Sequence, residues 1–330
     1  MSAYPSLRRA IVLMATLGLL VTATAPSALA TFPGHNGLLA VPDDHDGYVV
    51  GVLRIAPTGR PQNALRAGLF TGCAEDTDPF VCTPQGTTAP LFGRASFSRD
   101  GHELVIGGGR LALLTNNGTG LTMLPRLTWF DDDPSFFPGG AVVAFDGALS
   151  TKQAPGTGEY VSRGIFTVRT DGTEPKQLTA DGFYPEVSPT GGWIAYNRNG
   201  PRHRVDLWLM RSSGSGQHLL ATNAEYPSFS PDGRHLAFAS VEHGASVIER
   251  IDLTGNGRRS LVRGGSYPAW SPDGRLIAYT HNTVFGGQPD ESDLWLIPAS
   301  GGKRRRLAYD NPVSEDTPSF YVPAWQPLPG

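Results

Sequence analysis

The sequence has no excess of basic residues. Its 330 residues include 27 Lys and Arg against 30 Asp and Glu, which gives a net charge of −3 at pH 7. A protein that grips nucleic acid through its phosphates carries a basic patch or stripe. The charge balance therefore argues against a nucleic-acid partner.

Long helical periodicity and a serine-hydrolase motif are also missing. Beyond residue 30, no stretch repeats apolar residues at helical spacing over a long window. The sequence contains no Gly-x-Ser-x-Gly elbow, so catalysis by a serine nucleophile has no support. We expect an all-β chain without nucleophilic catalysis.

The first 30 residues have the composition of an export signal. Arg8 and Arg9 precede an apolar run at 10–23, and Ala28-Leu29-Ala30 supplies a small-residue cleavage site. The apolar run is short for a membrane span, so we expect no transmembrane segment in the mature chain. Residues 6–12 also fit a loose twin-arginine pattern, so the general secretory (Sec) route and the twin-arginine route both stay open. The sequence thus predicts a secreted, periplasmic or envelope protein that starts near Thr31.

The only two cysteines are Cys73 and Cys82. In an exported protein, an even pair at this spacing is most simply a disulfide that closes a small loop. The absence of a Cys-x-x-Cys motif gives a redox role little support.

One stretch recurs along the chain and reads each time as strand, tight turn, strand. It is clearest at Tyr267–Tyr279 and nearly identical at Tyr226–Phe238. In the later copy, Pro272 presets φ, Asp273 can bond nearby amides, and Gly274 tolerates the conformation that closes the turn. Weaker copies lie at 95–106, 134–145, 184–196 and, as a half copy, 323–327.

A large apolar residue precedes the turn in most copies. These anchors are Phe97, Phe136, Val187, Phe229, Trp270 and Trp325, spaced 39 to 55 residues apart. A small residue recurs four positions after the turn glycine, at Ala144, Ala195, Ala237 and Ala278, and indicates close packing between units. Four-stranded units repeating at about 40–45 residues are typical of propeller blades. Six anchors predict one six-bladed, all-β propeller over residues 31–330.

The Ser-Pro-Asp-Gly turns, seen whole at 230–233 and 271–274, resemble the WD40-like repeats of the TolB-type β-propeller family. The resemblance extends over nearly all of the mature chain. It implies a propeller that acts as a non-enzymatic scaffold for an envelope protein. The chain departs from the family pattern because strands follow the signal directly, so we expect the family's N-terminal α/β domain to be absent.

The two ends of the mature chain are predicted to complete one blade. Residues 34–41 resemble a turn and a second strand, and 48–55 and 62–66 supply two more strands. The half copy at 323–327 supplies the missing innermost strand. Pairing the C-terminal strand with the N-terminal strands would close the ring and leave no open sheet edge, which favours a monomer.

Strand polarity separates the connections into two ends of the propeller. We define the long-loop face as the end with the connections from second to third strand and from fourth strand to the next blade. Its long connections are 67–93, 146–162, 281–292 and 308–322. The connections at this end are richer in acidic residues, and the rest of the mature chain is richer in basic ones. We therefore predict an acidic face that attracts a basic partner or a cation; the alternative is that these charges only keep the protein soluble.

A ring of residues is predicted at the mouth of the central tunnel on this face. Tyr184, Tyr226 and Tyr267 each precede the proline that opens an innermost strand, and Asp133 holds the equivalent place. Asp131 and Asp132 would add two carboxylates. An aromatic and acidic mouth suits a peptide, a sugar or a basic side chain; the alternative is that the tyrosines only cover strand ends.

Metal ligation is a weaker hypothesis. Residues 131–133 and 43–46 are acidic enough for a divalent cation such as calcium, but neither has the spacing of a known calcium loop. His243 and His281 follow second strands of adjacent blades and, with Asp146, are weak candidates for a transition-metal site.

Two functions follow from these observations. The first is a non-enzymatic propeller that binds a protein or peptide on its acidic long-loop face. The second is a metal-assisted propeller lyase or lactonase that acts on a sugar-type substrate. The second would need Asp133, Asp146, His243 and His281 to converge on the tunnel.

Overall fold

The fold is described from a computed structural model of the chain. It describes residues 35–45, 48–55, 94–107, 109–117, 119–154, 157–285, 288–308 and 323–328. The predicted export signal, the pair Cys73 and Cys82, and Asp46 lie outside these residues. Within them, no helix is both long and apolar enough to cross a membrane.

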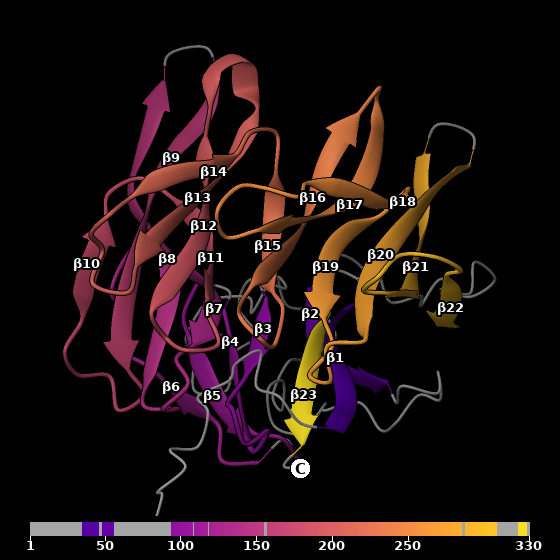
Figure 1. Ribbon diagram of the computed structural model, residues 1–330. Coiled ribbons are helices and arrows are strands. Elements are labelled where there is room, and N and C mark those ends of the chain that lie inside the picture. Colours follow the sequence, from indigo (N-terminus) through magenta and orange to yellow (C-terminus); the bar gives the residue numbers. More distant parts are fainter. Residues whose placement is uncertain are drawn as a thin grey trace, which may run out of the picture.

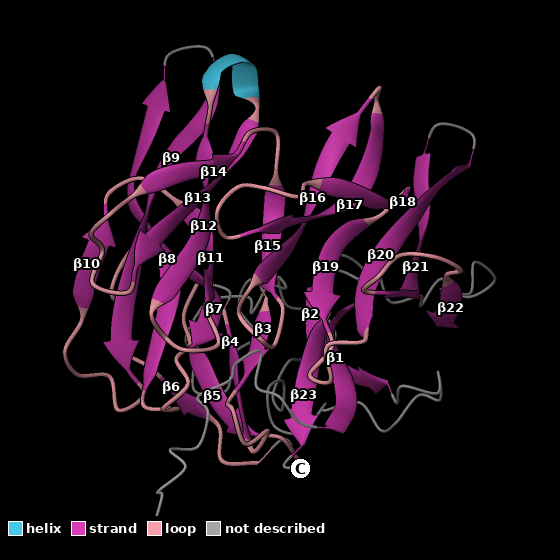
Figure 2. Cartoon of the chain, viewed as in Figure 1, coloured by secondary structure: helices cyan, strands magenta, loops and turns pink. Residues whose placement is uncertain are grey.

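Almost all regular structure in this part of the chain is antiparallel β-sheet. The first three of the four-stranded sheets span residues 95–221. They are β3 (Ala95–Phe97), β4 (Glu103–Ile106), β5 (Ala112–Thr115) and β6 (Thr122–Met123); β7 (Asp131–Phe136), β8 (Val142–Ala154), β9 (Thr157–Arg169) and β10 (Lys176–Thr179); and β11 (Phe183–Val187), β12 (Trp193–Asn199), β13 (Val205–Arg211) and β14 (His218–Ala221). A short 3-10 turn, η2 (Pro201–His203), joins β12 to β13 and is cyan in Figure 2.

Two more four-stranded sheets follow, and one three-stranded sheet combines strands from both ends of the chain. They are β15 (Glu225–Phe229), β16 (His235–Glu242), β17 (Ala245–Asp252) and β18 (Arg259–Arg263); β19 (Ser266–Trp270), β20 (Leu276–Phe285), β21 (Gln288–Pro298) and β22 (Arg305–Ala308); and β2 (Tyr48–Ile55), β1 (His35–His45) and β23 (Ala324–Leu328). Figure 1 shows these sheets around the molecule, with β23 beside β1. The all-β propeller fold is therefore confirmed, with five four-stranded blades in the described residues.

The first strand of each four-stranded sheet faces the middle of the molecule. In chain order, each of these innermost strands contacts the next, from β3 through β7, β11 and β15 to β19. The C-terminal strand β23 contacts both β19 and β3. The predicted pairing of the C-terminal strand with an N-terminal strand is present, because Trp325 of β23 lies opposite Leu39 of β1.

The recurring turn has the geometry that its residues predict. Ser271 Oγ donates to Asp273 Oδ1 at 2.6 Å, and the same carboxylate oxygen accepts from the Arg275 amide at 3.0 Å. The Leu276 amide donates to Ser271 Oγ at 2.9 Å. Gly274 adopts φ of 73°, in the left-handed region that glycine tolerates. A serine and an aspartate thus bond three polar groups of the turn, and Trp270 Nε1 adds a bond to the Gly274 carbonyl at 3.1 Å.

The core lies between neighbouring sheets. The alanines predicted to mark close packing, Ala144, Ala195, Ala237 and Ala278, are all fully buried. Phe229 and Phe238 of one blade pack in the same cluster as Ala195 and Leu209 of the blade before it. Close approach of the blades at these positions excludes larger side chains.

Two of the predicted long loops are strands. The structure continues β8 to Ala154 and starts β9 at Thr157, and these extended arms pair Lys152 with Tyr160. In the same way, β20 and β21 pair as far as Phe285 and Gln288. The prediction of loops at 146–162 and 281–292 was therefore wrong. Backbone pairing outweighs the low strand propensity of the Gly, Ser, Asn and Asp residues there.

Candidate functional site

A backbone bulge sets the predicted ring of residues apart from the strands around it. Tyr184, Tyr226, Tyr267 and Asp133 have φ values of 51°, 54°, 51° and 46°. At each position the pairing with the second strand shifts register. The left-handed conformation is unfavourable for residues other than glycine, and a bulge redirects a side chain out of the regular pleat. The four residues therefore hold equivalent places, as the sequence predicts.

The three tyrosines form a continuous row across three blades. The ring centroids of Tyr184 and Tyr226 are 4.9 Å apart, and those of Tyr226 and Tyr267 are 4.1 Å apart. All three side chains are half-buried. The Tyr226 amide also donates to Asn197 Oδ1 at 3.0 Å, which ties this bulge to β12 of the preceding blade. Such a row presents a continuous aromatic surface at the start of three innermost strands.

Next to the tyrosine row, one guanidinium gathers three carboxylates. Arg163 of β9 lies 3.2 Å from Asp132 Oδ2, 3.7 Å from Asp133 Oδ2 and 2.9 Å from Asp146 Oδ2. The side chains of Asp133 and Asp146 are almost completely buried. The sequence predicted Asp132 and Asp133 at this mouth. It grouped Asp146 with Asp133 only in the enzyme hypothesis, and it missed Arg163. We call Asp132, Asp133, Asp146 and Arg163 the acidic cluster.

Burial makes this cluster hold protons tightly. Desolvation, opposed by the attraction of Arg163 and assisted by the charge of Asp132, raises the pKa of Asp146 to about 7. The pKa of Asp133 is raised well above its ordinary value by burial and then by the charges of Asp132 and Asp146. One arginine therefore does not balance three buried carboxylates at neutral pH.

Asp131 does not join the acidic cluster. Its Oδ2 accepts from the Leu127 amide at 2.9 Å, and its Oδ1 accepts from the Thr128 amide at 2.9 Å and from Thr128 Oγ1 at 2.8 Å. Both oxygens are thus used to hold the loop before β7. The geometry gives Asp131 a structural task, whereas its two neighbours pair with Arg163.

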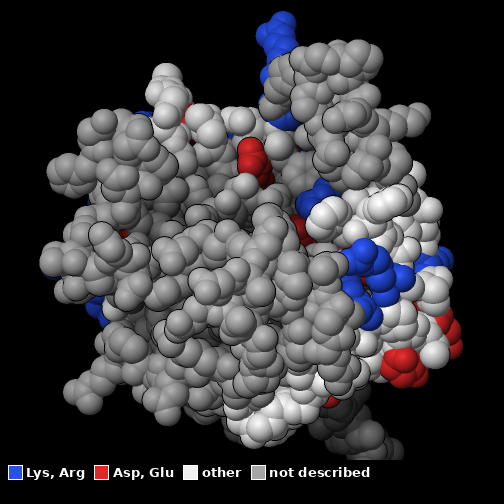
Figure 3. Space-filling model, turned by 180° about the vertical axis from the view of Figure 1, so that it is seen from behind, with Lys and Arg blue, Asp and Glu red and all other residues white. Residues whose placement is uncertain are grey.

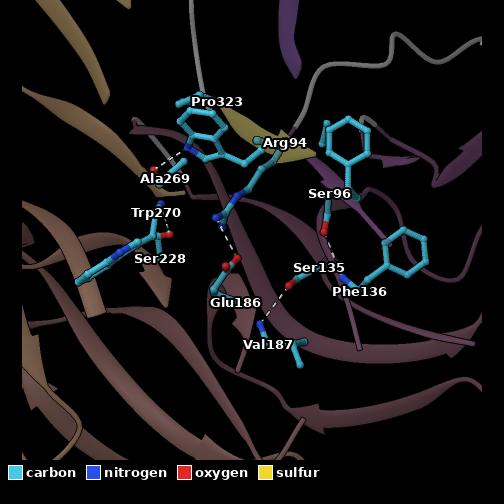
Figure 4. Close-up of a pocket in the computed structure, with 14 residues that line it drawn as sticks. Arg94, Ser96, Ser135, Phe136, Glu186, Val187, Ser228, Ala269, Trp270 and Pro323 are labelled. Atoms are coloured by element: carbon cyan, nitrogen blue, oxygen red, sulfur yellow. Dashed lines mark hydrogen bonds and ion pairs between the residues drawn. The ribbon is translucent and has the colours of Figure 1, made fainter. Parts of the chain in front are cut away.

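Deeper in the tunnel, Arg94 and Glu186 form an ion pair of 2.9 Å. Figure 4 shows the two side chains pointing toward each other inside a cavity of about 70 Å³ that residues of all six innermost segments line. Burial raises the pKa of Glu186, and Arg94 opposes this shift. Arg94 lies three residues before the anchor Phe97. Each residue of the predicted ring likewise lies three residues before the anchor of its own strand. Comparing the residues three positions before the anchor in all copies would have identified Arg94.

Glu186 interrupts a series of serines. Ser96, Ser135 and Ser228 occupy the same place in other innermost strands, one residue before the anchor. Each serine hydroxyl accepts a hydrogen bond from a backbone amide of another blade's innermost strand. In the order of the serines, the donors are Phe136 at 3.2 Å, Val187 at 3.0 Å and Trp270 at 3.0 Å. These bonds hold innermost strands together (Figure 4). A carboxylate in one of these places brings charge into the tunnel.

The weak metal candidates do not converge. Asp146 is paired with Arg163, His243 is exposed in the turn between β16 and β17, and the His281 ring lies 5.7 Å from that of Trp295. Within the described residues, no group of three or more His, Cys, Asp or Glu is placed to hold a metal ion. The side chains of the acidic stretch at 43–46 lie outside the part that can be assessed.

The predicted division of charge between the two ends stays a prediction. The connections at 67–93 and most of 308–322, on which it largely depends, lie outside the described residues. Figure 3 shows the back of the molecule, where the described surface carries basic and acidic side chains close to each other.

Solved structures of low sequence identity share this fold. TolB from Acinetobacter baumannii is 14% identical with a TM-score of 0.65, and the match covers 88% of this chain and 67% of that chain. A chain of a nidogen/laminin complex is 12% identical with a TM-score of 0.62, covering 89% and 99%. An oligogalacturonate lyase in complex with manganese is 16% identical with a TM-score of 0.54, covering 79% and 71%. At these identities the likeness shows the β-propeller fold alone. No family model and no curated protein matches the sequence.

Proposed function

We propose that this protein is a non-enzymatic binding propeller that holds a protein or peptide partner at its tunnel mouth. The observation that carries the proposal is the convergence of the tyrosine row and the acidic cluster at that mouth. Four bulged positions hold these groups at the cost of backbone strain, and such strain gathers at binding sites. A similar fold in TolB and in a chain of a nidogen/laminin complex is consistent with a protein partner.

We also infer that the three-stranded sheet is a sixth blade. It takes the place between β19 and β3, because β23 contacts both of these strands. The segment predicted at 62–66 would be its fourth strand. A closed ring of six blades leaves no innermost strand unpaired and keeps the tunnel mouth rigid.

The same proposal includes the setting in which the propeller works. Residues 1–30 direct export, Cys73 and Cys82 form a disulfide, and the mature propeller is a monomer in the envelope or outside the cell. N-terminal sequencing of the secreted protein and its mass before and after reduction test the first two points.

A second candidate is a propeller enzyme, either a lyase or a lactonase acting on a sugar-type substrate. Buried carboxylates with raised pKa values are typical of acid and base catalysts, and Asp133, Asp146 and Glu186 have these properties. The fold is also similar to that of an oligogalacturonate lyase. Cleavage of oligogalacturonate, lost on the change Asp146→Asn, would favour this candidate over the binding propeller.

Capture of a partner by the mature chain, residues 31–330, tests the binding proposal. The bait is offered to envelope extract of the source organism beside a variant with Tyr226→Ala and Tyr267→Ala. A matched control carries Arg234→Ala in the exposed turn between β15 and β16, at the other end of the innermost strand from Tyr226. We expect one protein to be captured by wild type and control and lost by the tyrosine variant. Equal capture by all three would contradict the proposed site.

A further inference from the structure

Carboxylates outnumber guanidiniums in the tunnel and at its mouth. Among the described residues, Asp132, Asp133, Asp146 and Glu186 form ion pairs with two arginines, Arg94 and Arg163. Glu225, whose pKa burial also raises, lies beside Tyr226 and adds a fifth carboxylate. A buried charge without a counter-charge is costly, so a proton or a bound cation must supply the missing positive charge.

Asp146 is a buried carboxylate whose ion-pair partner, Arg163, is shared with two other carboxylates. Its side chain is fully buried, and neither carboxylate oxygen has a hydrogen bond of good geometry with a described residue. Arg163 Nη1 lies 2.9 Å from Oδ2, but the same guanidinium is shared with Asp132 and Asp133. The Asp146 carboxylate therefore has capacity to accept a further donor.

The tyrosine row is close enough to this cluster to form the rest of a cation site. Asp133 holds in β7 the bulged place that Tyr184 holds in the neighbouring strand β11. Burial raises the pKa of the Tyr184 phenol, and the charges of Asp133 and Asp146 raise it further. Tyr226 and Tyr267 continue the aromatic surface from there. Aromatic faces attract cations most strongly where water is partly excluded.

We infer that the tunnel mouth binds a lysine or arginine side chain of the partner, seated between the tyrosine row and the carboxylates of Asp133 and Asp146. This inference rests on the proposed function, because it assigns the chemistry of the partner at the same mouth. An organic cation fits better than a hard metal ion. A metal ion would want several carboxylate oxygens at once, whereas Arg163 already holds three carboxylates and three of the surrounding groups are phenol rings. An ammonium or guanidinium can instead donate to one carboxylate and lie against a ring.

Short capped peptides test this inference without the natural partner. The probes are Ac-Ala-Ala-X-Ala-Ala-NH2, in which X is Lys, Arg, norleucine or Glu. Binding to the mature chain is followed by NMR of ring-labelled tyrosines, and the signals of Tyr184, Tyr226 and Tyr267 are assigned with Tyr→Phe variants. We expect Lys and Arg peptides to shift these signals with an affinity at least about tenfold higher than that of the norleucine peptide.

Three variants keep the test specific. Asp133→Asn and Asp146→Asn should each weaken the Lys and Arg peptides by about tenfold or more. Asp171→Asn, an exposed change in the turn between β9 and β10, should leave binding unchanged. Retained ring signals in the free variants show that each is folded.

Several results would overturn the inference. Equal binding of the norleucine peptide would mark an apolar site, and tighter binding of the Glu peptide would mark an anion site. The same shifts caused by calcium chloride, with none from the Lys and Arg peptides, would mark a metal site. In each of these cases, the capture experiment would still test the protein-binding proposal separately. The failure of this inference and the failure of the proposed function are therefore distinguishable.

Discussion

At the scale of single residues, the mouth combines groups that folding alone would not favour. Asp133 and the three tyrosines occupy a left-handed conformation, and Asp133 and Asp146 are buried next to each other's charge. Each arrangement costs stability, of the order of 1 kcal/mol or more for each strained residue. A binding role for this region would explain why the protein retains residues that lower its stability there.

The buried carboxylate of Asp146 makes a prediction about pH. Its pKa is about 7 in the folded protein against an ordinary value of 3.8, so the folded state holds this proton more strongly than the unfolded state. The stability that comes from the bound proton is fully present below about pH 4 and is lost as pH rises through about 7.

Replacing Asp146 by Asn should remove that dependence. Urea unfolding of wild type and Asp146→Asn, each measured at about pH 5 and about pH 8, should show wild type losing a few kcal/mol more than the variant over this range. A variant that loses as much stability as wild type would show that Asp146 does not titrate there.

The bulged conformation of Tyr226 makes a second prediction. Its φ of 54° suits glycine, whereas alanine meets the same backbone penalty as tyrosine. Tyr226→Gly should therefore be about 1 kcal/mol more stable than Tyr226→Ala in chemical denaturation, although both remove the ring and both should lose the partner. An alanine variant as stable as the glycine variant would mean that the bulge relaxes when the ring is removed.

At the scale of elements, the serines of the innermost strands connect one blade to another. The Val187 amide donates to Ser135 Oγ at 3.0 Å, and both residues are buried. Removing that hydroxyl leaves a buried amide without its partner, so Ser135→Ala should cost about 1–3 kcal/mol of unfolding free energy. Ser213→Ala, at an exposed serine between β13 and β14, is the matched control and should change stability little. Equal values for the two variants would show that the bond between the blades contributes nothing.

The elements also show what the sequence could and could not reveal. The turn at 271–274 and the small residues such as Ala278 were predictable, because the chemistry of each is local. The arms of β8 and β9 were not, since their pairing depends on partners across the hairpin and outweighs local composition. Glu186 could have been noticed as a carboxylate in a series of serines. The meeting of Arg163 with Asp146 could not, because it depends on the register of β8 against β9.

At the scale of the whole molecule, the C-terminal strand links the first and the last four-stranded blades, because β23 contacts both β3 and β19. Trp325 of β23 is 6% exposed, and its Nε1 donates to the Ala269 carbonyl of β19 at 3.1 Å. It therefore joins the last four-stranded blade to the sheet formed by the two ends of the chain. Its anchor position was predictable from the repeat, whereas its bond to Ala269 was not.

Truncating this side chain should weaken the whole propeller. Trp325→Ala removes a buried aromatic side chain and should cost about 3–5 kcal/mol. A single unfolding transition shifted to lower denaturant, followed by both tryptophan fluorescence and far-UV circular dichroism, would show that closure stabilises all blades together. An early separate transition confined to one probe would show instead that the last sheet unfolds alone.

The central claim is that a protein partner sits on the tunnel mouth, and photo-crosslinking tests it most directly. A photoreactive p-benzoylphenylalanine is placed at Tyr267, and in a second protein at Arg234, in the exposed turn at the other end of the neighbouring blade's innermost strand. Both are irradiated in envelope extract of the source organism, and the products are identified by mass spectrometry. The account predicts one crosslinked protein from position 267 and none from position 234. A crosslink from position 234 alone, or the same product from both, would contradict it.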